Sequence, residues 1–281
     1  MGLRIQNNVE AFNTHRQLNA TSTQASKAME KLSSGYRINR AADDAAGLAI
    51  SEKMRGQIGG LAVAQRNAQD GISLVQTAEG ALTEVHSMLQ RIRDLGVQYK
   101  NGTVSAEDKK AIEAEVVQLA IEINDIGTTT KFNGTALFGS AASFTFQVGA
   151  NDGESITTTA FTPSATGASG GLSEIIAASA SAGASALMAS GTLLAVVDKA
   201  IENVSTARAN FGAVQNRLEH RLNNLATYQE NLTAAESRIR DVDMAAEMTK
   251  FTKLNILQQA GTSMLAQANQ APQTVLSLLK G

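Results

Sequence analysis

The 281-residue chain predicts a mainly α-helical fold: a long antiparallel coiled-coil rod with a small β-hairpin region, and a pair formed by the N- and C-terminal helices. Residues 48–100 and 192–240 each carry a small or apolar residue at every seventh position, the period of a coiled-coil seam. Read inward from either terminus, the chain begins with a helix that has few large apolar residues and continues with a long heptad helix. Two such halves pair antiparallel if the chain doubles back on itself.

The composition excludes several classes of function. A formal net charge of −2 offers no basic surface for nucleic acid, and the absence of cysteine removes disulfides and cysteine metal sites. Only two prolines occur, which permits very long helices. The first residues contain no apolar run typical of a secretory signal peptide, so we expect export, if it occurs, to use another route.

Residues 1–34 are expected to form a helix with a thin apolar stripe. Half of its seventh-position residues are alanine, so the helix buries little apolar surface and is marginal by itself. Gly35 can end it, and Asp43 or Asp44 can cap the next helix. The recurring residues are Ala11, Leu18, Ala25 and Leu32.

The two heptad segments predict the coiled coil. The first extends over roughly 80 Å as a helix, and Gly71 in its seam allows a close approach of the partner. The second repeats over seven positions from Val197 to Ile239 without a miss. The seam residues that define the pair are Leu61, Val75, Leu82 and Leu89 in the first helix and Val204, Phe211, Leu218 and Leu225 in the second.

The segment between the long helices changes in character. Asn101-Gly102 predicts a turn, and Ser105 with Asp108 predicts a capping box that opens a helix ending near Ile126. Its expected inner face is Ile112, Val116, Leu119 and Ile123. Hairpin turns are predicted at Asn133-Gly134 and Asp152-Gly153, with a strand in which Phe144, Phe146 and Val148 alternate with polar residues.

The C-terminal stretch 254–279 carries no charge over 26 residues. Its many amides and hydroxyls make a membrane span unfavourable, so no membrane insertion is expected. A core helix that happens to lack charge is one interpretation. We favour a helix whose every face meets protein, including other copies of the chain, with Leu257, Gly261, Met264 and Ala268 on its apolar side.

No catalytic site is predicted. His15, His86 and His220 have no second histidine at metal-ligand spacing, and no glycine-rich loop follows a strand to open a helix. We therefore expect neither enzymatic activity nor a cofactor.

Long runs of the sequence closely resemble bacterial flagellin, the subunit of the flagellar filament. The resemblance covers roughly residues 1–160 and 192–281, which leaves only an Ala/Ser/Gly-rich middle unmatched. The runs that carry it are EKLSSGYRINRAADDAAGLAIS (30–51), RNAQDGISLVQTAEGALTEV (66–85), LQRIRDL (89–95), KFNGTALF (131–138), ESRIRDVD (236–243) and NILQQAGTSMLAQANQAPQTVLSLL (255–279).

The resemblance implies a minimal flagellin without large central domains. An inner assembly domain would comprise 1–43 and 241–281, a rod domain 44–165 and 190–240, and a short variable connection 166–189. Such a subunit polymerises into the extracellular filament for swimming motility, leaves the cell by the flagellar type III apparatus without a cleaved signal peptide, and folds its terminal helices on assembly. A hook–filament junction protein of the same apparatus is the alternative.

The resemblance also implies sites and partners. The partners are other copies of the chain, an export chaperone, the filament cap protein, hook-associated junction proteins and a host Toll-like receptor. Receptor recognition would use an Arg, a Leu and a Glu presented on the rod: Arg91, Leu95 and Glu115. The export chaperone or cytosolic sensors would bind Val275, Leu276, Leu278 and Leu279. The expected assembly interface is Leu18, Ala25, Leu32, Leu254, Leu257, Ala260, Met264 and Ala268.

Overall fold

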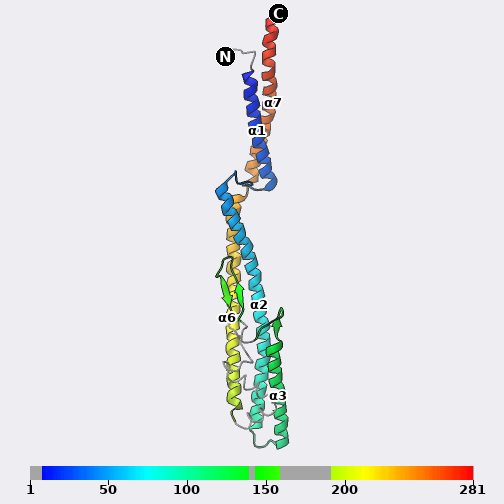
Figure 1. Ribbon diagram of the computed structural model, residues 1–281, viewed down its shortest axis with the longest axis vertical. Coiled ribbons are helices and arrows are strands. Elements are labelled where there is room, and N and C mark those ends of the chain that lie inside the picture. The colour runs from blue at the N-terminus through cyan, green and yellow to red at the C-terminus, as the bar shows by residue number, and fades with distance from the viewer. Residues whose placement is uncertain (1–7, 139–142, 159–190, 281) are drawn as a thin grey trace. The chain divides into compact units, whose positions relative to one another are not determined.

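The structure, a computed structural model, describes residues 8–138, 143–158 and 191–280, with side chains described up to residue 270. The predicted connection 166–189 lies outside the described residues. The helices are α1 (Val9–Ser34), α2 (Ala45–Tyr99), α3 (Ala106–Thr129), α6 (Leu193–Arg240) and α7 (Met244–Lys280), and the strands are β1 (Lys131–Phe132), β2 (Thr135–Ala136), β3 (Thr145–Gln147) and β4 (Ser155–Thr157) (Figure 1). The mainly α prediction with small hairpins is confirmed.

Two compact units divide the chain. The terminal unit comprises residues 1–57 and 230–281, and the central unit comprises residues 58–229. The division falls inside α2 and α6, whereas the sequence places domain boundaries at the breaks between helices, near residues 43 and 241. The family-based division into inner and rod domains stays a prediction.

In the central unit α2 and α6 run antiparallel, as predicted. Six of the eight predicted seam residues form one core with α3 and the β3–β4 hairpin; Leu61 and Leu225 lie outside it, and none of the eight is more than 6% exposed. Polar pairs between α2 and α6 flank this core. Along them the residue numbers increase in α2 and decrease in α6, as antiparallel helices require. The pairs are Gln65–Gln229, Glu79–Arg208 and Arg93–Asp198.

Gly71 explains how the second hairpin joins this core. A Cβ atom at Gly71 would lie 3.1 Å from the ring of Phe146 and 3.2 Å from Leu218. Phe146 on β3 pairs with Ile156 on β4 in an antiparallel ladder, and Ile156 is buried. The missing side chain therefore lets both the hairpin and α6 approach α2 closely.

The turn and cap predictions are confirmed where the structure describes them. The Ser105 side chain accepts from the Asp108 N–H at 3.1 Å, and the Asp108 carboxylate accepts from the Ser105 N–H at 3.3 Å. Asn133 and Gly134 both adopt positive φ, 49° and 80°, as the tight β1–β2 turn requires. On α3 the predicted inner face packs against the core, with Leu119 at its edge and partly buried, and Ala120 joins the core as well.

The terminal unit pairs α1 with α7, again antiparallel. Near one end Asn8 caps α1 and donates its side-chain amide to the Ala268 carbonyl at 2.7 Å. Near the middle, a Cβ atom at Gly261 would lie 3.2 Å from Leu18. Near the other end a small cluster forms between the helices, made of Ala25, Ala28 and Leu254 with Phe251 packed against it. The predicted pairing of the terminal helices is confirmed, although the described part of α1 begins at Val9.

Leu218→Ala tests the core of the central unit. Leu218 is fully buried, so its truncation should lower the free energy of unfolding of the subunit by about 2–5 kcal/mol. Urea unfolding of the unpolymerised subunit, followed by circular dichroism, measures this loss. Leu257→Ala, at a side chain 47% exposed in the terminal unit, is the matched control and should change it by less than about 0.5 kcal/mol. Equal losses in both variants would contradict the assignment of Leu218 to the core.

Candidate functional site

Exposed large apolar side chains concentrate on the terminal unit. Among the described residues, 10 of the 14 exposed large hydrophobic side chains lie there, although it is the smaller unit. We call these ten residues the apolar surface: Val9, Phe12, Met29, Tyr36, Ile50, Met244, Met248, Ile256, Leu257 and Met264. Single exposed apolar residues are ordinary, but such a concentration on one unit is typical of a surface that another protein covers.

The two sides of α7 explain this exposure. Leu254 and Ala268 are buried against α1, and Gly261 faces Leu18. Ile256 and Met264, by contrast, are 61% and 57% exposed. Leu257, Gly261, Met264 and Ala268 fall on one side of α7 by helical spacing, as expected, but only the small residues of this set meet α1, while Leu257 and Met264 stay exposed.

The predicted interface residues divide accordingly. Ala25, Leu254 and Ala268 are buried within the chain, and Leu18 and Leu32 are half-buried. Leu257, Ala260 and Met264 are exposed on α7. Only the exposed members are free to contact another copy in the subunit as it stands, so the role of the whole set in assembly stays a prediction.

A polar cluster that the sequence analysis missed joins the end of α6 to the segment after α1. The backbone N–H of Arg37 donates to the Arg240 carbonyl at 2.6 Å, and the Val242 N–H donates to the Gly35 carbonyl at 3.0 Å. The Arg240 guanidinium lies 4.9 Å from the centre of the Tyr36 ring. We call Tyr36, Arg37, Glu52 and Arg240 the latch; its arginines lie within the family-like runs, but their spacing in the chain gives no sign of contact.

Two carboxylates of the terminal unit are held in their charged form. The hydrogen bond from Arg240, at 2.5 Å, lowers the pKa of Glu52. Two backbone N–H groups, of Arg40 and Asn39, lower the pKa of Asp43. The neighbouring Asp44 accepts from the Gly47 N–H at 2.9 Å, so capping, as predicted, is the role of this acidic pair.

The residues assigned to receptor recognition lie in the central unit. Arg91 forms two short contacts with Glu115, at 2.7 and 2.8 Å, and both side chains are exposed. Leu95 is only 2% exposed and packs in the core. The structure therefore does not present Leu95 at the surface as the resemblance implies. Val275, Leu276, Leu278 and Leu279 lie outside the residues whose side chains are described.

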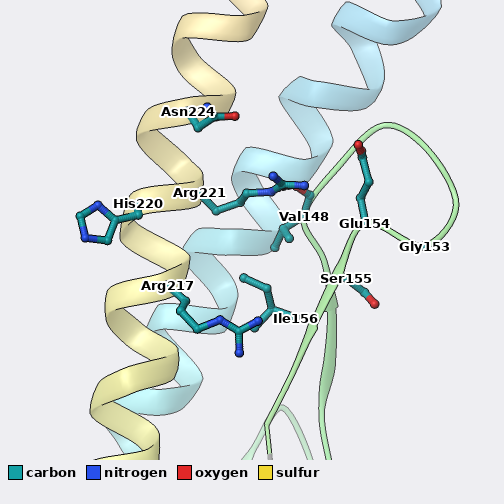
Figure 2. Close-up of a pocket in the computed structure, with 9 residues that line it drawn as sticks. All are labelled: Val148, Gly153, Glu154, Ser155, Ile156, Arg217, His220, Arg221 and Asn224. Carbon is teal, nitrogen blue, oxygen red and sulfur yellow. Dashed lines mark hydrogen bonds between the residues drawn. The ribbon is translucent and has the colours of Figure 1, made fainter.

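An open pocket lies between α6 and the β3–β4 hairpin (Figure 2). Arg221 crosses from α6 toward the hairpin and donates its Nε–H to the Val148 carbonyl at 3.3 Å. The lining offers arginine side chains over an apolar floor but no nucleophile with a base beside it. Within the described ranges there is no cluster of three or more metal-ligating side chains, and no helix is long and apolar enough to span a membrane.

Comparison with known proteins identifies the family. The model of the bacterial flagellin N-terminal helical region matches residues 5–143, and that of the C-terminal helical region matches residues 194–279. The chain belongs to the bacterial flagellin family. It is 50% identical to a flagellin of Bacillus subtilis, over 99% of this chain and 100% of that protein. It is 52% identical to a flagellin of Halalkalibacterium halodurans, over 98% and 99% of the two chains.

A solved structure shares the fold. The structure of a flagellar hook-associated protein from Vibrio parahaemolyticus matches with a TM-score of 0.57 over 71% of this chain and 100% of that chain. Its sequence identity is 15%, so it shows the fold alone and gives no support to the junction-protein alternative. Full-length flagellin relatives at about half identity favour a filament subunit instead.

The latch predicts an acid-dependent stability of the terminal unit. Because the folded-state pKa of Glu52 is lowered, its contribution is present above the ordinary glutamate pKa and is lost as the pH falls through the lowered value. Between about pH 5 and about pH 3 the wild-type terminal unit should lose more stability than Glu52→Gln, in which the titrating group is gone. Thermal unfolding across this range measures the difference. Glu122→Gln, on the exposed face of α3, should follow the wild type; identical curves for all three chains would contradict a role for Glu52.

Proposed function

We propose that this flagellin is a filament subunit whose terminal unit becomes fully stable only when other copies cover its apolar surface. The function of the family, a structural subunit of the extracellular flagellar filament, follows from the matches at both ends of the chain. The proposal concerns how this chain carries out that function. One observation supports it above others: the unit with the smaller core also exposes most of the large apolar side chains.

The contrast between the two cores supports folding on assembly. The central unit buries leucine, isoleucine, valine and phenylalanine from three helices, whereas the buried cluster between α1 and α7 contains two alanines and one leucine. Ordering a residue costs about 1–2 kcal/mol of backbone entropy, which so little buried apolar surface offsets poorly. Covering an exposed isoleucine or methionine contributes up to about 1.5–3 kcal/mol per side chain. Polymerisation can thus supply the stability that the isolated pair lacks.

Polar residues on α7 fit the same role. Thr262 and Ser263 direct their hydroxyls to carbonyls of their own helix, and Gln259, Gln267 and Gln270 are exposed. Uncharged amides can hydrogen-bond to a neighbouring copy or to water without the desolvation cost of an ion. We propose that they accompany the apolar contacts between copies.

Other partners stay predictions at the level of the family. Recognition by a host Toll-like receptor would begin at the exposed Arg91–Glu115 pair, with Leu95 holding the backbone of α2 in place from the core. Binding of an export chaperone, contact with the cap and junction proteins, and export without a cleaved signal peptide also remain expectations drawn from the family.

Met264→Lys tests the proposed assembly surface. The side chain is 57% exposed in the subunit, so lysine should be accepted there without loss of helical content. In the filament a lysine at this position would bury an unpaired charge, which costs several kcal/mol. We expect seeded polymerisation, followed by electron microscopy, to be abolished or reduced at least about tenfold.

Met264→Leu is the matched control, because it keeps the apolar volume and adds no charge. It should form filaments at the wild-type rate. Normal filaments from Met264→Lys, with an unchanged circular dichroism spectrum, would place Met264 outside the assembly surface and refute its part in the proposal.

A further inference from the structure

Half of the methionines in the chain are exposed at the surface of the terminal unit. Of the eight methionines, Met29, Met244, Met248 and Met264 are 51%, 48%, 50% and 57% exposed, and all four belong to the terminal unit. Met88 provides the contrast: it is half-buried and packs against the core of the central unit. The exposed thioethers thus lie on α1 and α7, the helices assigned to assembly.

We propose that these four methionines are oxidation sites through which a peroxide reversibly switches off polymerisation of the unassembled subunit. The proposal rests on the assembly surface proposed above. In the reaction the thioether sulfur attacks one oxygen of hydrogen peroxide, an S–O bond forms and the O–O bond breaks. The sulfur loses two electrons and becomes a sulfoxide, and the peroxide is reduced to water.

The composition of the chain directs the oxidant to these sites. There is no cysteine, so no thiolate competes for peroxide. An accessible thioether is the next most readily oxidised side chain, and its reactivity follows its exposure. Exposure of about half a side chain at each of four sites therefore gives the terminal unit the largest share of reactive sulfur among the described residues.

The expected effect follows from the change in polarity. Methionine is a flexible apolar side chain that fills irregular gaps between packed helices. Its sulfoxide is polar and chiral, so burying it against another copy leaves an oxygen acceptor without a partner. The fold of the subunit itself should persist, because none of the four thioethers belongs to a buried cluster.

The geometry spreads the sites over the helix pair. Met244 and Met248 are one turn apart and lie on the same side of α7. Met29 follows Ala28, which packs near Leu254, so it lies in the same half of the pair as Met248. Met264 lies in the other half, beyond Gly261. Oxidation at either half would therefore place a sulfoxide on the apolar surface.

The experiment treats purified subunit and preformed filament with hydrogen peroxide and maps sulfoxides by mass spectrometry. In the subunit the four sites should oxidise about tenfold faster than Met88, and the treated subunit should lose at least about tenfold in seeded polymerisation. Incubation with the two methionine sulfoxide reductases, one for each epimer, and dithiothreitol as the two-electron reductant should return each sulfoxide to the thioether with release of water and restore polymerisation. In a variant with Met29, Met244, Met248 and Met264 all replaced by Leu, peroxide should not lower polymerisation below the level of the same variant untreated, whereas Met88→Leu should lose at least about tenfold on treatment, as the wild type does.

The outcomes separate this inference from the assembly proposal. Fully oxidised subunit that polymerises normally, or lost polymerisation that the reductases do not restore, overturns the inference. Oxidation of the four sites at the same rate in filament and subunit overturns the assembly surface itself. If the four-leucine variant does not polymerise even without peroxide, recovery of the wild-type subunit by the reductases decides the question.

Discussion

The shallow packing of α1 on α7 is the interaction on which the behaviour of this chain depends. The α2–α6 pair and the α1–α7 pair are both antiparallel, but the side chains at their contacts differ in size. Leu, Ile, Val and Phe fill the α2–α6 seam, whereas Ala25, Ala28 and Gly261 form much of the contact between α1 and α7. Small residues bring the terminal helices close and leave their large side chains, such as Phe12 and Ile256, exposed. A marginal helix pair with an apolar exterior is suited to association with identical copies.

The latch residues hold the segments next to α1 and α7 together by hydrogen bonds and an ion pair. Hydrogen bonds from Arg37 tie the segment after α1 to the end of α6, and the Arg240–Glu52 ion pair ties that end of α6 to α2. The Arg240 side chain is 12% exposed, and its Nε–H has no partner among the described groups, so this arginine bears a desolvation cost for its position. Backbone hydrogen bonds and an ion pair, close to where one helix ends and the next begins, thus position α1 and α7, which make few apolar contacts with each other.

The sequence allows the long elements to be predicted and leaves much of the candidate site open. Heptad spacing, the capping box at Ser105 and the Asn133-Gly134 turn depend on local rules, and the structure bears them out. Spacing places Leu257, Gly261, Met264 and Ala268 on one side of α7, but it does not show which of them pack against α1, because that depends on the partner helix. The latch joins Glu52 to Arg240 across 188 positions, which no local pattern indicates. The burial of Leu95 beside exposed Arg91 likewise depends on the packing of α2 against its neighbours.

Hydrogen exchange of backbone amides, compared between the unpolymerised subunit and the filament, tests the central claim most directly. In the subunit, amides of α1 and α7 should exchange far faster than those of the α2–α6 seam, because opening the terminal pair exposes little buried surface. In the filament the same amides should slow by at least about a hundredfold, which corresponds to about 3 kcal/mol of added protection. Strong protection of α1 and α7 in the subunit, with no change on polymerisation, would show that the terminal helices are stable by themselves and would contradict the account.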